Sequence, residues 1–325
     1  YERALRLAAA LPHRAREDDT AAIREGHAGS LTAAARELWR PVLLELRRGP
    51  HAVDAGPRPS APVEPRRGVI TLLPCRFLAN AAVLEARALL RQGRGVEAVQ
   101  WPLDAATFGN DLTINATLIE QLIGNTVTAI AIYTAWSPAL LAQLDGQALE
   151  LLAAGLASLD DRLPARARFD ADLVLLARSL EQPGYVELGG ALAAWRYGFS
   201  TRWMLAEAFH EVRRRLGRLD RSSPSWSARE AMLEHEHAAV LLSLNPIARQ
   251  VTPGMTGIER QFRDTLTGLR LLRTAIDLHL GAEPTKLADP FGTGPLVVEQ
   301  AANGYFIRSV GERAGKPLER EVMLL

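Results

Sequence analysis

Apolar residues recur at helical spacing along most of this chain, and that repetition limits its fold more than any other feature. After Pro74, apolar side chains stand three or four residues apart, at Ala79, Val83, Leu84, Ala86, Leu89 and Leu90. Such positions lie on the same face of an α-helix, so the segment predicts a helix with one side to bury. Glycine breaks such as Gly93-Arg94-Gly95 and Asp145-Gly146 end one helix and open the next. The sequence therefore predicts a series of helices joined by short connections.

The same reasoning predicts further helices and some of their ends. Segment 112–136 is apolar on nearly every side, so we expect it at the centre of the core. Pro41 and Pro102 fall inside helical patterns and are expected to bend them. Thr256 is placed to cap the last helix, with Glu259 at the reciprocal position. Besides the helix after Pro74, the predicted helices are 1–10, 31–48, 96–108, 112–136, 138–143, 147–159, 165–180, 191–218, 227–242 and 256–280.

After the last of these helices the period of the sequence changes. Residues 296–298 and 305–310 are rich in β-branched and aromatic side chains, and Asn303-Gly304 between them is typical of a tight hairpin turn. A third short strand is predicted at 321–325. Because a two-stranded ribbon is marginal alone, we expect it to pack on a helix, most simply 256–280.

The expected fold class is therefore mainly α: an antiparallel helical bundle or hairpin array with a small C-terminal antiparallel β element. We expect three parts. Residues 1–67 hold the N-terminal helices and a proline-rich crossing segment, 68–254 form the helical core, and 255–325 hold the long helix and the β-hairpin tail.

Composition and charge exclude several classes of protein. Of 325 residues, 48% are apolar and 23% are charged, so the chain can bury a sizeable core. The 38 basic and 37 acidic residues give a net charge of +1, which argues against a nucleic-acid partner. The sequence contains no Gly-x-Ser-x-Gly elbow, phosphate-binding loop or Rossmann fingerprint, so we expect no cofactor and no small-molecule substrate. The longest apolar run, 126–136, is too short to span a bilayer.

The single cysteine and the paired acids give little sign of catalysis. Cys75 rules out an internal disulfide and any Cys-x-x-Cys site. It stands at a predicted helix start, where a thiol pKa can be lowered, but no pattern of His or Asp makes it a nucleophile. The pairs Asp160-Asp161 and Asp170/Asp172 are placed before or at helix starts, where the helix dipole stabilises carboxylates.

Two Glu-x-x-His units are the sharpest candidate for chemistry. Glu207 and His210 share one helix face, and Glu234 and His237 share another, because residues three apart are neighbours on a helix. In di-iron carboxylate bundles, two such units and a Glu from each of two other helices surround the metals. The competing interpretation is exposed or half-buried helix faces with ordinary ion pairs, because both units lie beside charged stretches. Further possible ligands are Glu120, Glu150, Glu211 and His235.

Two other patterns bear on partners. Trp195, Phe199 and Trp203 fall four residues apart and form a stripe on one helix face. Such a stripe packs in the core or, where it is exposed, marks a partner surface. Residues 84–108 resemble one tetratricopeptide hairpin, and a peptide-binding groove there would need further repeats.

The tail resembles a known family. A long helix, then Asp289-Pro290-Phe291-Gly292, Gly304-Tyr305 and Ser309-Val310-Gly311, resembles the C-terminal part of the major pseudopilins of type II secretion systems. The segments TLIEQLIGNTVTAIA and LNPIAR are similar to those of a group of uncharacterised, membrane-anchored, mostly helical bacterial proteins. Unlike a pseudopilin, the chain has a long helical body before the tail, and its loop after the matching strand offers only Glu312 as a calcium ligand.

The resemblance implies an exported, periplasmic protein tethered to the inner membrane, with its anchor expected upstream of Tyr1. Because no convincing catalytic set is found, we expect a non-enzymatic scaffold or assembly subunit that binds protein partners through its helical body. The alternative is a metal-dependent, ferritin-like enzyme that uses the two Glu-x-x-His units.

Overall fold

The computed structural model of this chain describes residues 2–12, 33–52, 72–114, 116–168, 203, 206–211, 213–215, 225–243, 255–313 and 316–323. Within these residues the chain is mostly helical and ends in a small antiparallel sheet, which confirms the expected fold class. Most of the predicted helices 165–180 and 191–218 lies outside the described residues.

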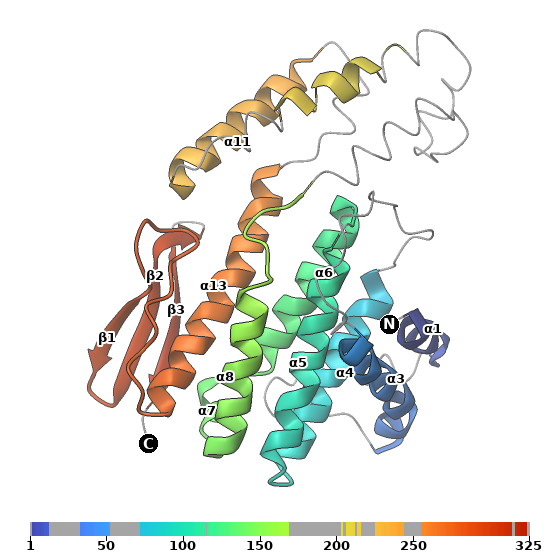
Figure 1. Ribbon diagram of the computed structural model, residues 1–325, viewed down its shortest axis with the longest axis vertical. Helices are drawn as coiled ribbons and strands as arrows, with labels where there is room; N and C mark the ends of the chain where they lie inside the picture. Colours follow the sequence, from blue (N-terminus) through green and yellow to red (C-terminus); the bar gives the residue numbers. More distant parts are fainter. Residues whose placement is uncertain are drawn as a thin grey trace.

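The helices stand side by side in a row (Figure 1). The row runs from α1, α3 and α4 at one end through α5, α6 and α8 to α13, and the sheet covers the outer side of α13. Helix α11 crosses one end of α13 and lies apart from the row. The helices are α1 (Glu2–Ala10), α3 (Ala33–Ala52), α4 (Leu72–Leu90), α5 (Gly95–Leu112), α6 (Leu118–Ala129), the π-helix η2 (Ile130–Thr134), α7 (Pro138–Leu141), α8 (Gly146–Asp160), α11 (Trp226–Leu241) and α13 (Met255–His279).

Most breaks in the sequence act as predicted, and the bends expected at Pro41 and Pro102 stay a prediction. Gly93 has a φ of 71°, a left-handed conformation that glycine adopts easily, and the chain turns there from α4 into α5. Helices α3 and α5 continue through Pro41 and Pro102. The tertiary packing of these helices outweighs the local cost of proline.

The predicted helix 112–136 is divided differently from the expectation. Helix α5 continues to Leu112, and α6 begins only at Leu118. The reason is a capping box at Thr117: its backbone N–H donates to Glu120 Oε2 at 2.8 Å, and its hydroxyl accepts from the Glu120 N–H. These bonds satisfy donors that the first turn of a helix leaves unpaired, and so they fix its start.

Close helix crossings depend on glycine. A Cβ on Gly109 of α5 would lie 2.5 Å from Thr128 Oγ1 and 2.6 Å from the carbonyl oxygen of Gly124, both on α6. Likewise, a Cβ on Gly155 of α8 would lie 2.5 Å from Leu103 Cδ1 on α5. A larger residue at Gly109 would force the backbones of α5 and α6 apart, and one at Gly155 would displace the Leu103 side chain.

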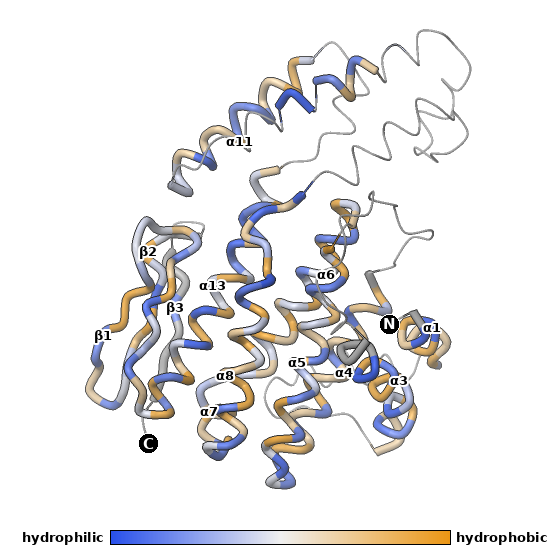
Figure 2. The backbone as a smooth tube through the Cα atoms, viewed as in Figure 1, coloured by the Kyte–Doolittle hydropathy of each residue, from blue (hydrophilic) through white to orange (hydrophobic). Residues whose placement is uncertain are grey.

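One apolar core joins the row of helices to the sheet. Its members run from Ala4 in α1 to Ile307 in the sheet, so all three predicted parts of the chain contribute to it. The bulkiest fully buried side chains include Trp39, Trp136 and Phe108. Figure 2 shows hydrophobic residues on every helix of the row, mixed with hydrophilic ones, as expected of helices that bury one face. The three domain boundaries stay a prediction.

The sheet has three antiparallel strands in the order β1 (Val297–Ala301), β2 (Gly304–Arg313) and β3 (Lys316–Met323). Ala301 pairs with Gly304, so the turn residues are Ala302 and Asn303, one position earlier than expected. Strand β3 also begins earlier than the predicted 321–325. Strands β2 and β3 pack on α13, which confirms the predicted support.

Candidate functional site

The two Glu-x-x-His units lie on or near α11, and their side chains mostly point to solvent. Glu207, His210 and Glu234 are exposed, and His237 is half-buried. In the part of the chain that the structure describes, no group of three or more His, Cys, Asp or Glu side chains is placed to hold a metal ion. The described structure therefore offers no ligand set for these units, and the metal hypothesis stays a prediction.

The buried acid of this region is Glu236, between the two predicted ligands. Arg215 Nη1 donates to Glu236 Oε2 at 2.6 Å, and Arg215 Nη2 donates to Glu211 Oε1 at 2.7 Å. Ser243 Oγ also donates to Glu211 Oε2 at 3.1 Å. Burial lowers the pKa of Arg215, but its bonds to the two carboxylates outweigh this and raise it. These contacts join residues 206–215 to α11. Sequence reasoning missed them because Arg215 stands in a run of arginines that suggests a solvated face.

A second charged cluster joins α11 to α13. Glu259 Oε1 accepts from Arg229 Nε at 2.5 Å and from Arg263 Nη2 at 3.0 Å, and all three side chains are buried. Burial lowers the pKa of Arg263, as do the charges of Arg166 and Arg229, while Glu259 raises it. The predicted capping role of Glu259 is wrong, because helix α13 already begins at Met255. The Glu259 carboxylate binds two arginines instead.

Aromatic side chains line the same cluster. The rings of Trp226, in α11, and Phe291, in the tail, meet edge to face with their centroids 5.5 Å apart. The guanidinium carbon of Arg263 lies 4.8 Å from the centroid of the Trp226 ring, at the range of a cation–π contact. Arg263 Nη1 also donates to the carbonyl of Pro290. Three elements therefore meet here: α11, α13 and the turn that opens the tail.

Asp289 joins the Asp-Pro-Phe-Gly turn of the tail to the Ser-Val-Gly residues of β2. Its Oδ1 accepts from the Phe291 N–H at 2.9 Å. Its Oδ2 accepts from Ser309 Oγ at 2.8 Å and from the Val310 N–H at 2.6 Å. Asp289 and Ser309 are both buried. A carboxylate whose oxygens are occupied in this way holds the turn against β2, and it is not free to act as an acid or base.

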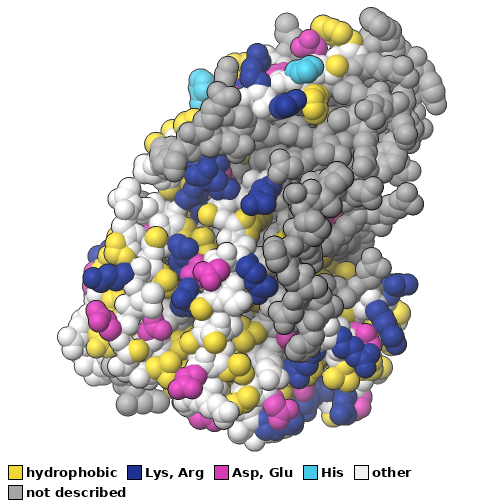
Figure 3. All heavy atoms as spheres, viewed as in Figure 1, with side chains coloured by type: hydrophobic (Ala, Val, Ile, Leu, Met, Phe, Trp, Pro, Cys, Tyr) yellow, Lys and Arg dark blue, Asp and Glu magenta, His cyan; other side chains and the backbone are white. Residues whose placement is uncertain are grey.

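Asp160 holds the end of α8 to α13. Arg270 Nε donates to its Oδ1 at 2.9 Å, and Arg273 Nη1 binds its Oδ2. Arg270 Nη1 also donates to the carbonyl of Ala288, at 2.6 Å. Asp160 is the last residue of α8, where the helix dipole disfavours a carboxylate and the two cations compensate; most of the predicted helix 165–180, which it was expected to precede, lies outside the described residues. Basic side chains gather over α13 on the face shown in Figure 3. Asp170 and Asp172 lie outside the described residues.

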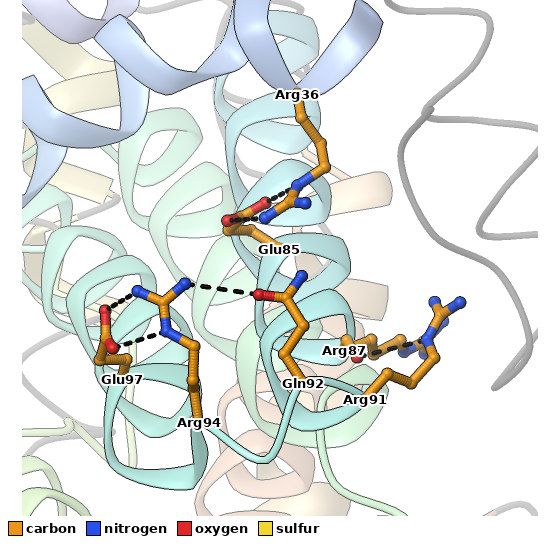
Figure 4. Close-up of polar contacts among 7 residues, drawn as sticks. All are labelled: Arg36, Glu85, Arg87, Arg91, Gln92, Arg94 and Glu97. Atoms are coloured by element: carbon orange, nitrogen blue, oxygen red, sulfur yellow. Dashed lines mark hydrogen bonds and ion pairs between the residues drawn. The ribbon is translucent and has the colours of Figure 1, made fainter. Parts of the chain in front are cut away.

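Arginines on α3, on α4 and in the turn between α4 and α5 form a third group (Figure 4). Arg36 binds Glu85 through two parallel bonds of 2.7 and 2.6 Å, which join α3 to α4. Arg87 is buried, and its Nη2 donates to the carbonyl of Thr134 at 2.7 Å. Burial lowers the pKa of Arg87, and the neighbouring charge of Arg91 lowers it further. The contacts in this group join helices or close their ends.

The thiol of Cys75 is fully buried in α4. Burial raises its pKa to about 12, which outweighs a backbone hydrogen bond that lowers it. The helix start therefore does not lower the pKa of this thiol, because the loss of hydration disfavours the thiolate more than the helix start favours it.

Large apolar side chains are exposed on and near α11. Trp203 is 59% exposed, and Leu242, the residue after α11, is 83% exposed. Trp195 and Phe199, the other members of the predicted aromatic stripe, lie outside the described residues. Contiguous exposed apolar patches are typical of protein interaction surfaces, whereas single exposed residues, such as Leu73 and Ile119 elsewhere in the described structure, are common.

No helix among the described residues is long and apolar enough to span a membrane. No family model, no curated protein and no solved structure matches this chain.

Proposed function

We propose that this protein is a non-enzymatic assembly subunit, exported and tethered to the inner membrane, that binds a protein partner through its helical arm. The arm consists of residues 206–211 and 213–215 together with α11, joined by the contacts of Arg215 with Glu211 and Glu236.

The distribution of side chains on the arm carries the proposal. Leu233, Val240 and the Arg215–Glu236 ion pair are turned inward, while Leu241 and Leu242 are exposed on the same helix as Glu234 and His235. Trp203, just before the arm, is exposed as well. A helix pair that works alone in water places apolar groups inside and charges outside. Trp203, Leu241 and Leu242 depart from this arrangement, and a protein partner that covers them would remove their apolar surface from water.

The rest of the described structure agrees with a structural role. Asp160, Glu259 and Asp289 each bind groups of another element, so the buried acids serve to join helices and tail. The resemblance of the tail to pseudopilins supports export and tethering, because those subunits act in a periplasmic assembly.

Photocrosslinking in the native cell tests the partner. A photoreactive amino acid is placed at position 203 or 242 of the full-length chain, and we expect both to crosslink to the same protein. The matched control is position 73, because Leu73 of α4 is 60% exposed, nearly the same as Trp203. Equal crosslinking from all three positions, or recovery of the chain only as a free monomer without crosslinks, would contradict the proposal.

Location is tested separately. Protease added to spheroplasts should digest the full-length chain without lysis, and alkaline extraction should leave it in the membrane fraction. A chain protected until lysis would contradict export but would leave the crosslinking result unaffected.

A further inference from the structure

Helix α11 is attached to the row of helices at the first turns of α13. Two routes lead from this attachment into the tail, and both pass through the turn of residues 289–292. One is polar and the other is aromatic.

The polar route runs through the charged cluster. Arg229 of α11 binds Glu259 at 2.5 Å, Glu259 binds Arg263 at 3.0 Å, and Arg263 binds the carbonyl of Pro290. Removal of Glu259 leaves two buried guanidinium groups without their carboxylate, and removal of either arginine leaves Glu259 with one partner, so the contacts support one another.

The aromatic route runs from Trp226 of α11 to Phe291. Phe291 is held from the other side by the tail: its N–H donates to Asp289, and a Cβ on Gly311 would lie only 3.0 Å from the Phe291 carbonyl carbon. Asp289 in turn accepts from Ser309 and Val310 of β2. The position of the Phe291 ring therefore depends on the fit between the turn and β2.

We infer that the docking of α11 on α13 is coupled to the docking of the tail, and that Asp289 controls this coupling although it binds only tail residues. The folded turn presents the Pro290 carbonyl to Arg263 of α13 and the Phe291 ring to Trp226 of α11, so α11 contacts the turn directly through Trp226 and indirectly through the charged cluster. Since coupling is reciprocal, a ligand that draws α11 away from α13 also loosens the turn from β2. The inference does not depend on the proposed function, because it concerns the isolated full chain.

Hydrogen exchange of the full chain, read by mass spectrometry, tests the inference. Asp289→Asn keeps the shape of the side chain but replaces one carboxylate oxygen by an NH₂ group. That group cannot accept the hydrogen bond that an N–H or O–H group now donates to Asp289. We expect exchange in the backbone of α11 to rise about three- to thirtyfold, as for mutations that alter coupling between sites. Faster exchange in residues 288–311 with unchanged exchange in α11 would overturn the inference.

A matched control and a reciprocal variant separate coupling from general loosening. Glu299→Gln removes the ion pair of Glu299 with Arg308 on the same sheet and should leave α11 unchanged. Trp226→Ala, in α11, should speed exchange in 288–296 and 304–311, and an effect confined to α11 would overturn the inference. Exchange in α5 reports global unfolding. If exchange in α5 also rises in Asp289→Asn, the milder variant Phe291→Leu is measured instead. Unchanged exchange in α11 of that variant, with faster exchange in 288–311, would overturn the inference.

Discussion

The phenol ring of Tyr133 lies directly against the backbone of α13 at Gly268, where an added Cβ would come within 2.5 Å of the ring atom Cε1. The Tyr133 hydroxyl donates to the carbonyl of Asp264, one turn earlier on the same helix. Tyr133 belongs to the π-helix η2, and the carbonyl of the next residue, Thr134, accepts from Arg87 of α4. The wider turn of η2 therefore connects two helices that are distant in sequence.

Gly268→Ala should lower the free energy of unfolding by about 0 to 2 kcal/mol, because the methyl group forces the partly exposed Tyr133 ring away from α13, while alanine gains about 0.5 to 1 kcal/mol over glycine inside a helix. Tyr133→Ala alone is expected to cost about 1 kcal/mol for the lost hydrogen bond, in addition to its packing. In the double variant the cost of the alanine at 268 should nearly vanish, since the ring that it displaces is gone. Urea unfolding of the four proteins checks this, and additive costs would contradict the contact.

Glu259→Gln should be far more costly than an equivalent change on the surface. It leaves Arg229 and Arg263 buried without their shared carboxylate, which typically costs about 3 to 5 kcal/mol of unfolding free energy. Glu299→Gln breaks a single exposed pair with Arg308 and should cost about 0 to 1 kcal/mol. Chemical denaturation of both variants compares them. Similar costs would mean that the cluster is hydrated.

Cys75 should resist thiol reagents in the folded protein at pH 8 and react fully in denaturant, because burial raises its pKa from 9.0 to about 12. A folded-state pKa above the unfolded one means that the folded chain keeps a proton that the unfolded chain has lost. The free energy of unfolding should then fall as pH rises from about 9 toward 12, by at most about 1.4 kcal/mol per pH unit from this group.

Cys75→Ala is the control for that pH dependence. The variant removes the titrating group from a fully buried position, so its stability should decline less steeply with pH than that of the wild type. Parallel pH profiles, or rapid labelling of the folded wild type, would show that the thiol is reached by water.

Local signals in the sequence predicted most of the helices and the sheet. The helix predicted at 147–159 is observed as Gly146–Asp160, and that at 256–280 as Met255–His279, because apolar period and adjacent Gly and Pro residues act over a few positions. The division near Leu112 was also readable, since Thr117 and Glu120 have the spacing of a capping box. Reading the segment as one apolar run hid that signal.

Contacts between distant residues could not be predicted from one sequence. Asp160 and Arg270 are 110 positions apart, and nothing local marks them as partners. Asp289 is intermediate: the resemblance to pseudopilins pointed to its turn, but only the structure shows its bonds to Ser309 and Val310. Charge pairing across a fold is decided by helix packing, which the period of a single segment does not specify.

The opposite roles of neighbouring acids on α11 give a further prediction. Glu234 is exposed and Glu236 is buried against Arg215, so Glu236→Gln should lower the unfolding free energy of the arm by about 1 to 3 kcal/mol while Glu234→Gln should not.

We also expect the full chain, purified without chelator, to hold no stoichiometric iron, manganese or zinc by elemental analysis, and we expect the same of the His210→Ala variant. Stoichiometric metal that is lost in Glu234→Gln and His210→Ala but kept in Glu236→Gln would reverse this assignment: it would make the Glu-x-x-His units a metal site, and the chain a ferritin-like enzyme.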